Sequence, residues 1–178
     1  SEVEEVIKEI EKLNEDVNRI DKEIVKRIRD LNREVNERDK EIVKEIKRLV
    51  EEVRKDNKRE LVDEALERVK KLAEDSKRIA DDVLRRTEKL LRESKKILED
   101  VNRTVRRLLE DLMRKRKDLE EVKDRLRKVL ESSSDNVRRV TEHTDKVLEE
   151  SRKNIEDVKK HTDEVVKEIE KEVRELKK

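Results

Sequence analysis

The stretch "LNEDVNRIDKEIVKRIRD" at Leu13–Asp30 is followed directly by "LNREVNERDKEIVKEIKR" at Leu31–Arg48. The second stretch repeats the first, with most apolar residues in the same places. Eighteen residues make about five turns of an α-helix, so each repeated side chain returns to the same side of the helix. A repeat that matches the natural helical period imposes almost no supercoil, whereas a heptad repeat imposes a left-handed one. The stretch therefore predicts a long, nearly straight helix.

The same period occurs further along the chain. Leu72 recurs as Leu90 and again as Leu108, and Ser76 recurs as Ser94. Apolar residues are spaced mostly three and four apart, which places them on one face of a helix. We therefore expect a second long helix that buries one stripe.

The segment "SSSDN" at Ser132–Asn136 has the composition of a loop, but the repeat continues through it. Val122, Val140 and Val158 are in phase on either side of it. We therefore expect the serines to be helical and to occupy polar positions that face the core.

The apolar phase is lost at only two places, "RKDNKRE" at Arg54–Glu60 and "MRKRKD" at Met113–Asp118. Three helices of similar length joined by short loops favour an up-down-up arrangement. The predicted fold is all-α: a long, nearly straight antiparallel three-helix bundle with 18-residue sequence repeats, forming a single domain over residues 1–178. The expected helices are about 2–55, 59–113 and 118–177, with loops at about 56–58 and 114–117.

The composition excludes several classes of protein. The chain has no Gly, Pro, Cys, Phe, Tyr or Trp, and 57% of its residues are charged, against about 25% in ordinary domains. Without turn glycines, β-hairpins and Gly-rich phosphate loops are not expected. The net charge is +1 and both signs are interspersed, which argues against a nucleic-acid-binding stripe or a basic membrane helix. We find no bilayer-spanning run and no signal-peptide core, so the sequence gives no cellular location.

Polar residues recur within or beside the apolar stripes. They could form a binding site or polar pathway, or they could form buried hydrogen-bond networks that specify register and helix order. Recurrence at a fixed period favours networks, because an active site occurs once. The candidate network residues are Asn14, Asn18, Asp21, Asn32, Asn36, Asp39, Ser76, Thr87, Ser94, Ser133, Asn136, His143, Thr144, Ser151, Asn154, His161 and Thr162.

A rough register follows from folding the helices back at the two breaks. It places Asp39, Ser76 and Asn154 at one height, with an equivalent layer around Asp21. A buried polar group without a partner costs about 1–3 kcal/mol, so we expect the members of each layer to bond one another.

The only two histidines lie in "HTDKVL" at His143–Leu148 and "HTDEVV" at His161–Val166. Their separation is about 27 Å along a helix, too far to share a metal ion. His-x-x-x-His spacing, cysteine and a nucleophile elbow are all missing, so we predict no metal, cofactor or catalytic site. We expect the rings at the edge of the core, hydrogen-bonded to a neighbouring helix at residues such as Thr87. Rings held neutral by burial would make the fold less stable in acid.

The repeats, the absence of aromatic residues, Gly and Pro, and the Asn, Ser, Thr and His layers together resemble de novo designed helical bundles with buried hydrogen-bond networks. This resemblance implies a straight, stable bundle made as a scaffold or as part of a switch. The chain departs from most such designs because its loops contain neither Gly nor Pro.

We therefore expect a structural scaffold with no natural biochemical activity: a monomer that is not an enzyme and requires no cofactor, nucleic acid, membrane or other partner. The alternative is an interaction or switch module that binds a further helix or self-associates, with pH sensitivity through His143 and His161. A natural spectrin-like spacer is disfavoured, because such repeats usually carry aromatic residues in the core.

Overall fold

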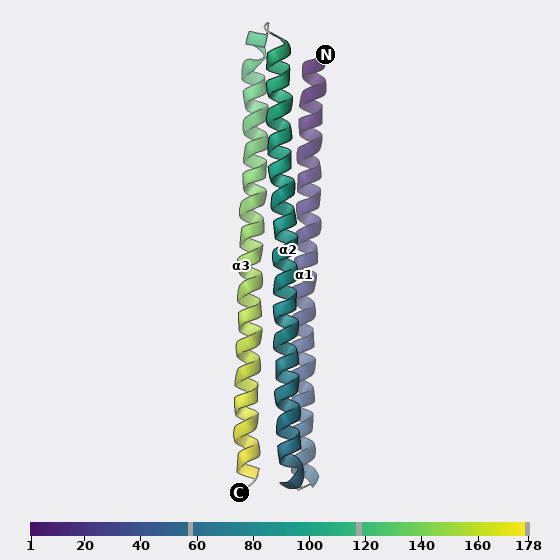
Figure 1. Cartoon of the computed structure of the whole chain (residues 1–178), viewed down its shortest axis with the longest axis vertical. Helices are drawn as coiled ribbons and strands as arrows, with labels where there is room; N and C mark the ends of the chain where they lie inside the picture. Colours follow the sequence, from purple (N-terminus) through teal and green to yellow (C-terminus); the bar gives the residue numbers. More distant parts are fainter. Residues whose placement is uncertain (57–58, 117–118, 177–178) are drawn as a thin grey trace. The chain divides into compact units, whose positions relative to one another are not determined.

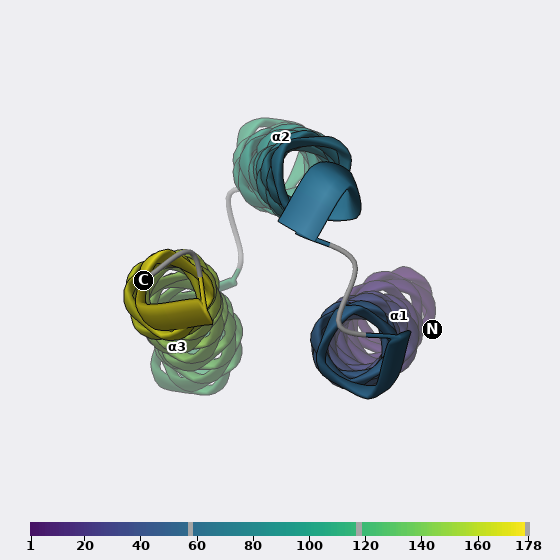
Figure 2. The same ribbon diagram turned by 90° about the horizontal axis from the view of Figure 1, so that it is seen from below.

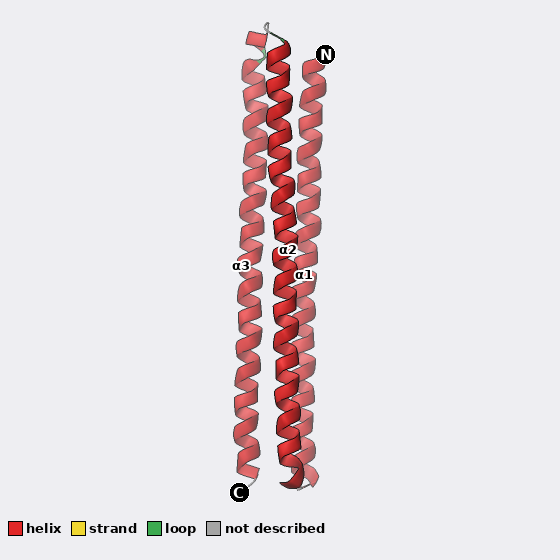
Figure 3. Cartoon of the chain, in the orientation of Figure 1, coloured by secondary structure: helices red, strands yellow, loops and turns green. Residues whose placement is uncertain are grey.

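The computed structural model describes residues 1–56, 59–116 and 119–176, and nearly all of them are helical (Figure 1, Figure 3). No strand occurs within these ranges. Short 3-10 turns precede the second and third long helices. The elements in chain order are α1 (Glu2–Asp56), Arg59–Leu61 as a 3-10 turn, α2 (Val62–Lys115), Leu119–Glu121 as a 3-10 turn, and α3 (Lys123–Leu176). The prediction of three long helices and an all-α fold is confirmed.

The ends of the helices carry charges that suit the helix dipole. Acidic residues occupy the first turn of each helix and basic residues the last, for example Glu2 and Arg54 in α1. Ser1 caps α1, because its Oγ accepts a hydrogen bond from the backbone N–H of Glu4 at 3.4 Å. These interactions stabilise helix ends by offsetting unpaired backbone groups.

The boundaries differ from the predicted ones mainly at the second connection. The third helix was expected to begin at about residue 118, but a 3-10 turn precedes it and α3 begins at Lys123. A change of apolar phase marks a break but does not show how many residues the turn takes up. Predicted loop residues 57, 58 and 117 lie outside the described ranges.

The contacts divide the chain into two compact units, each described by itself. The first unit comprises Ser1–Arg27 and Glu88–Leu148, and the second unit comprises Ile28–Thr87 and Glu149–Lys178. Every unit therefore contains one segment of each long helix. A single bundle domain over the whole chain stays a prediction.

Side-chain pairs give the helix directions within each unit. In the second unit, Asp39 accepts a hydrogen bond from Ser76 and Glu45 forms an ion pair with Arg68. Residue numbers therefore rise along α1 as they fall along α2, so these two helices are antiparallel. Hydrogen bonds between α1 and α3 join residues 118 to 123 positions apart in the sequence, so these helices are parallel. Within a unit, the three helix segments lie at the corners of a triangle when seen end-on (Figure 2). This is the predicted up-down-up order.

Fully buried side chains recur with the sequence period. Ile10, Ile28 and Ile46 occupy the same position in successive repeats, and each is 1% exposed. In the first unit, Ile10 belongs to one apolar cluster that includes Val105 of α2 and Leu126 of α3. The second unit has two apolar clusters. Asp39 and its partners come between these two clusters in sequence, which makes them a polar layer within an apolar core.

The serine-rich segment lies inside α3, and Ser133 is 3% exposed. Its helical assignment is confirmed, but the expectation that the serines face the core holds only for Ser133, because Ser132 and Ser134 are exposed. The 18-residue repeat predicted the structure of this segment better than its loop-like composition did, because the segment keeps each side chain pointing in the direction that the repeat requires.

We expect backbone amides at residues 132–135 to exchange with solvent as slowly as those of flanking α3 residues, measured by hydrogen–deuterium exchange.

Ser133→Gly should lower the free energy of unfolding by about 0.5–1 kcal/mol for helix propensity, and by about a further 0.5–1.5 kcal/mol for its lost hydrogen bond. Ser132→Gly is the matched control, because Ser132 is exposed and loses only the first contribution. Equal losses for the two variants would show that Ser133 makes no bond in solution.

Candidate functional site

A side-chain amide of α1 bonds two polar residues of α3 in the first unit. Asn14 Nδ2 donates to Ser133 Oγ at 2.9 Å and to the carbonyl oxygen of Ile10 at 3.0 Å. Asn136 Nδ2 donates to Asn14 Oδ1 at 3.0 Å. Both polar atoms of the Asn14 amide are therefore paired, as burial of an amide requires.

The same layer recurs one repeat later in the second unit. Asn32 Nδ2 and Ser151 Oγ are 3.0 Å apart, and Asn154 Nδ2 donates to Asn32 Oδ1 at 3.0 Å. The α3 partners follow their α1 asparagine by 119 and 122 residues in both units. A repeated set of directional bonds therefore aligns α1 with α3 inside each unit.

A second kind of layer is built on a buried carboxylate of α1 in the second unit. Asp39 is 6% exposed. Its Oδ1 accepts a hydrogen bond from Ser76 Oγ of α2 at 3.3 Å and lies 2.9 Å from Thr162 Oγ1 of α3. Its Oδ2 lies 3.1 Å from Nδ1 of His161. This carboxylate therefore joins all three helices.

The counterpart in the first unit is less complete. Asp21 Oδ2 lies 3.2 Å from His143 Nδ1, but Asp21 Oδ1 is buried without a hydrogen-bond partner. Thr144 Oγ1 donates to the carbonyl oxygen of Thr141, within its own helix, at 2.9 Å. Ser94 is 3% exposed, and its side chain makes no hydrogen bond among the described residues. The two carboxylate layers share their composition but differ in how many bonds they make.

The repeated His-Thr-Asp triplet joins α3 to both neighbouring helices. Successive residues of an α-helix point about 100° apart, so three consecutive side chains point in three different directions. In each triplet the histidine meets an aspartate of α1 and the threonine faces the core, at 1% exposure. The aspartates pair with α2: Asp145 lies 3.4 Å from Lys95 Nζ, and Asp163 pairs with Lys77. The recurrence of the triplet is thus accounted for by packing.

Three further members of the predicted network have no side-chain hydrogen bond in the described part of the chain. Asn18 is exposed, and Asn36 is only partly buried. Thr87 is fully buried, and its Oγ1 has no partner. Thr87 was expected to bond a histidine, and that expectation is wrong, because His143 and His161 face aspartates instead.

The predicted register between α1 and α3 also needs correction. Asn154 was expected level with Asp39, but it bonds Asn32, 122 residues away in the sequence. The difference arises because α3 begins at Lys123, after a 3-10 turn, later than predicted. The predicted proximity of Asp39 and Ser76 is observed, since it depends only on the first connection.

Sequence reasoning missed the aspartates as partners of the histidines. The signal was present, because Asp21 and Asp39 are one repeat apart, as are His143 and His161. The histidine side chains are 45% and 55% exposed. The buried ring on which acid sensitivity depended is therefore not found.

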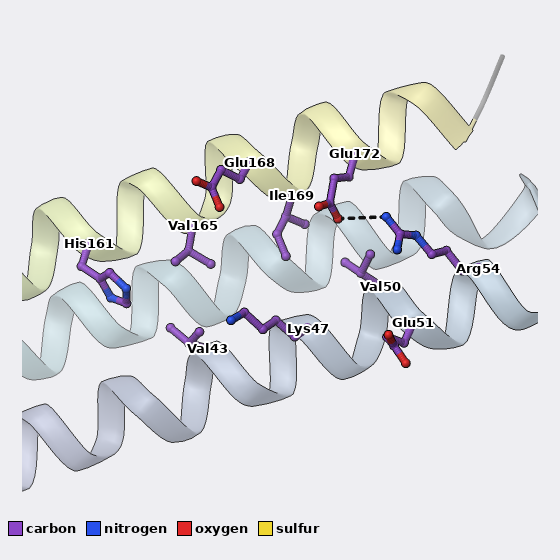
Figure 4. A pocket seen from close by; sticks show the side chains of 10 residues that line it. All are labelled: Val43, Lys47, Val50, Glu51, Arg54, His161, Val165, Glu168, Ile169 and Glu172. Carbon is purple, nitrogen blue, oxygen red and sulfur yellow. Dashed lines mark hydrogen bonds and ion pairs between the residues drawn. The ribbon is translucent and has the colours of Figure 1, made fainter.

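A shallow cavity of about 330 Å³ lies beside His161, between α1 and α3 of the second unit (Figure 4). Its apolar lining comes from Val43, Val50, Val165 and Ile169, and Lys47 and His161 lie on its walls. Residues 1–56, 59–116 and 119–176 contain no group of three or more His, Asp or Glu side chains placed to hold a metal ion. None of the described helices is long and apolar enough to cross a membrane.

No protein-family model matches the chain, and no curated protein is similar to it. Among solved structures, the chain is similar to one described as "Computationally designed three helix bundle". The two are 20% identical, the TM-score is 0.31, and the match covers 99% of this chain and 84% of the other. The three-helix architecture described above rests on this chain's own contacts.

Thr87→Val should increase the free energy of unfolding by about 1 kcal/mol, because it replaces a buried hydroxyl that has no partner with a methyl group of similar shape. Valine already occupies the equivalent positions 69 and 105, both 1% exposed. Denaturant unfolding of the two proteins measures the difference. A loss of stability would mean that the Thr87 hydroxyl finds a partner in solution.

Thr162→Val and Thr144→Val make a matched pair. Thr162 Oγ1 is within bonding distance of a buried carboxylate, so its removal should cost about 1.5–3 kcal/mol. Thr144 donates only to a backbone carbonyl of its own helix, and its removal should cost about 0.5–1 kcal/mol. Chemical denaturation of both variants tests this order. Thr162 Oγ1 also lies 2.8 Å from the carbonyl oxygen of Val158 in its own helix, so equal costs would indicate that Thr162 donates there and not to Asp39.

Proposed function

We propose that this chain is a de novo designed structural scaffold whose buried polar layers specify how its helices are aligned. On this proposal it is monomeric, has no natural biochemical activity, is not an enzyme, and requires no cofactor or partner. The role of the polar side chains is then to exclude incorrect arrangements of the three helices.

The observation that carries this proposal is the duplicated layer of Asn14, Ser133 and Asn136 at constant sequence separation. Apolar contacts are not directional, so a purely apolar interface tolerates slippage of one helix along another. A slip of one turn would bury side-chain amides without partners, at about 1–3 kcal/mol for each. A layer of bonded amides therefore favours one alignment, as a buried polar residue does in coiled coils.

Burial of the apolar side chains supports a self-contained bundle over the alternative interaction module. In doubled positions such as Leu90–Leu91, one residue is buried and the other partly buried by the chain itself. Among the described residues, the exposed large apolar residues are Leu61 and Met113, at 37% and 42%. A surface for an added helix would require a continuous apolar patch.

Two single variants and one triple variant test the proposal. Asn32→Leu should cost about 1–3 kcal/mol, because its partners remain buried and unpaired. Asn36→Leu should change stability little, because Asn36 makes no side-chain hydrogen bond among the described residues. Replacing Asn32, Ser151 and Asn154 together with apolar residues should retain or raise stability but allow mixed oligomeric states.

Denaturant unfolding and light scattering after size-exclusion chromatography give the two readouts. A triple variant that remains a uniform monomer would contradict the proposed role in specifying alignment. An unmodified chain that elutes as a stable oligomer would contradict the proposed monomer and favour a self-associating module.

A further inference from the structure

Beyond a scaffold role, and without making the chain an enzyme for any natural substrate, we propose that His161 is a nucleophilic site that accepts acyl groups from activated esters with short apolar chains and passes them to water. The proposal depends on two separate features of the second unit. One is the contact between the Asp39 carboxylate and Nδ1 of the imidazole, and the other is the cavity that His161 lines (Figure 4).

The carboxylate of Asp39 fixes which ring nitrogen is available. An ionised carboxylate can only accept a hydrogen bond, so Nδ1 of His161 must donate its proton to Oδ2 across the 3.1 Å contact. In the neutral ring the lone pair then lies on Nε2. Asp39 is itself held by Ser76 and Thr162, and its side chain is 8% exposed. The imidazole is therefore oriented by a group that has little freedom to move.

The ring is accessible to a reagent from solution, because 55% of the His161 side chain is exposed. The adjoining cavity of about 330 Å³ offers Val43, Val50, Val165 and Ile169 to a short acyl chain. Lys47 lines the same cavity, together with Glu51, Glu168 and the Arg54–Glu172 ion pair. A cation close to the ester carbonyl would stabilise the negative oxygen of a tetrahedral intermediate.

The reaction follows from these groups. The Nε2 lone pair attacks the acyl carbon, a nitrogen–carbon bond forms, and the bond from that carbon to the aryl oxygen breaks to release a phenolate. The ring becomes positively charged at this stage, and Asp39 stabilises that charge through Nδ1–H. Water then adds to the acyl carbon of the positively charged acyl-imidazole, and the nitrogen–carbon bond breaks. The ring returns to its neutral form with the proton still on Nδ1, and the carboxylic acid leaves as its anion, so that two protons are released to solvent.

His143 provides an internal control. It has the same Asp–His pair, with a 3.2 Å contact to Asp21 and 45% exposure. It does not line the cavity that His161 lines. A difference in reactivity between the two histidines therefore reports the cavity and the completed carboxylate layer, and not the mere presence of an imidazole.

The test uses the full chain with p-nitrophenyl hexanoate at about pH 8, where free imidazole is neutral, and follows release of p-nitrophenolate. His161→Gln should lower the second-order rate constant about tenfold, a modest part of what an oriented general base or nucleophile contributes. His143→Gln should lower it by less than about twofold on the same scale. Circular dichroism of each variant establishes that the helices are retained.

Three results would overturn the proposal: equal losses for the two variants, no loss for His161→Gln, or a rate per histidine no higher than that of free 4-methylimidazole. Acid quenching during turnover should also give a peptide containing residue 161 that is heavier by one hexanoyl group. Acylation found only on lysines would contradict the assignment. Both readouts are independent of oligomeric state, so failure of the scaffold proposal would not be mistaken for failure of this one.

Asp39 is assigned as a positioning residue, and nitrogen NMR of the unmodified protein tests that role. In the neutral ring, Nε2 of His161 should be the unprotonated nitrogen, and Asp39→Ala should return the ring to the mixed tautomers of free imidazole. If Asp39→Ala fails to fold, the tautomer of the unmodified chain decides the matter, and a proton on Nε2 with none on Nδ1 would refute the assignment.

Discussion

The structure depends on one geometric constraint: after 18 residues an α-helix has turned about five times and points each side chain in its original direction. Ile10, Ile28 and Ile46 are buried to the same degree because of it. The constraint also lets a three-residue segment such as His-Thr-Asp serve twice, with one residue directed to each neighbouring helix and one to the core. Apolar and polar layers can therefore follow one another without any change in helix geometry.

Polar side chains occur in such a core where neighbouring helices supply hydrogen-bond partners. Here the polar side chains differ in how many partners they have. Asp39 bonds side chains from two other helices, whereas Asp21 has one oxygen without a partner. Thr87 is buried at a position where the flanking repeats have valine. Repetition of a residue type therefore does not guarantee repetition of its bonds, because each hydroxyl can also donate to its own helix, as Thr144 does.

The sequence was sufficient to predict three helices and the helical state of Ser132–Asp135, because both depend only on the direction in which successive side chains point. The sequence was not sufficient to predict which polar residues of α1 and α3 lie at the same height. Asn154 was placed level with Asp39 because the length of the second turn had to be assumed, and each extra residue there shifts α3 against α1. The histidine partners were missed for the same reason, although the matched intervals of aspartate and histidine pointed to them.

Because the asparagine layer occurs twice, it cannot distinguish the correct alignment of α1 and α3 from one that is displaced by a whole repeat of 18 residues. A displacement of one turn leaves amides unpaired, but a displacement of one full repeat would place Asn14 opposite Ser151, a residue of the same type as its own partner. Within one chain the short connections forbid such a displacement. Between chains that exchange helices nothing in these layers forbids it, and each offset pair would expose an unpaired layer at either end. Such contacts do not close on themselves, so the products would be open-ended polymers of indefinite length.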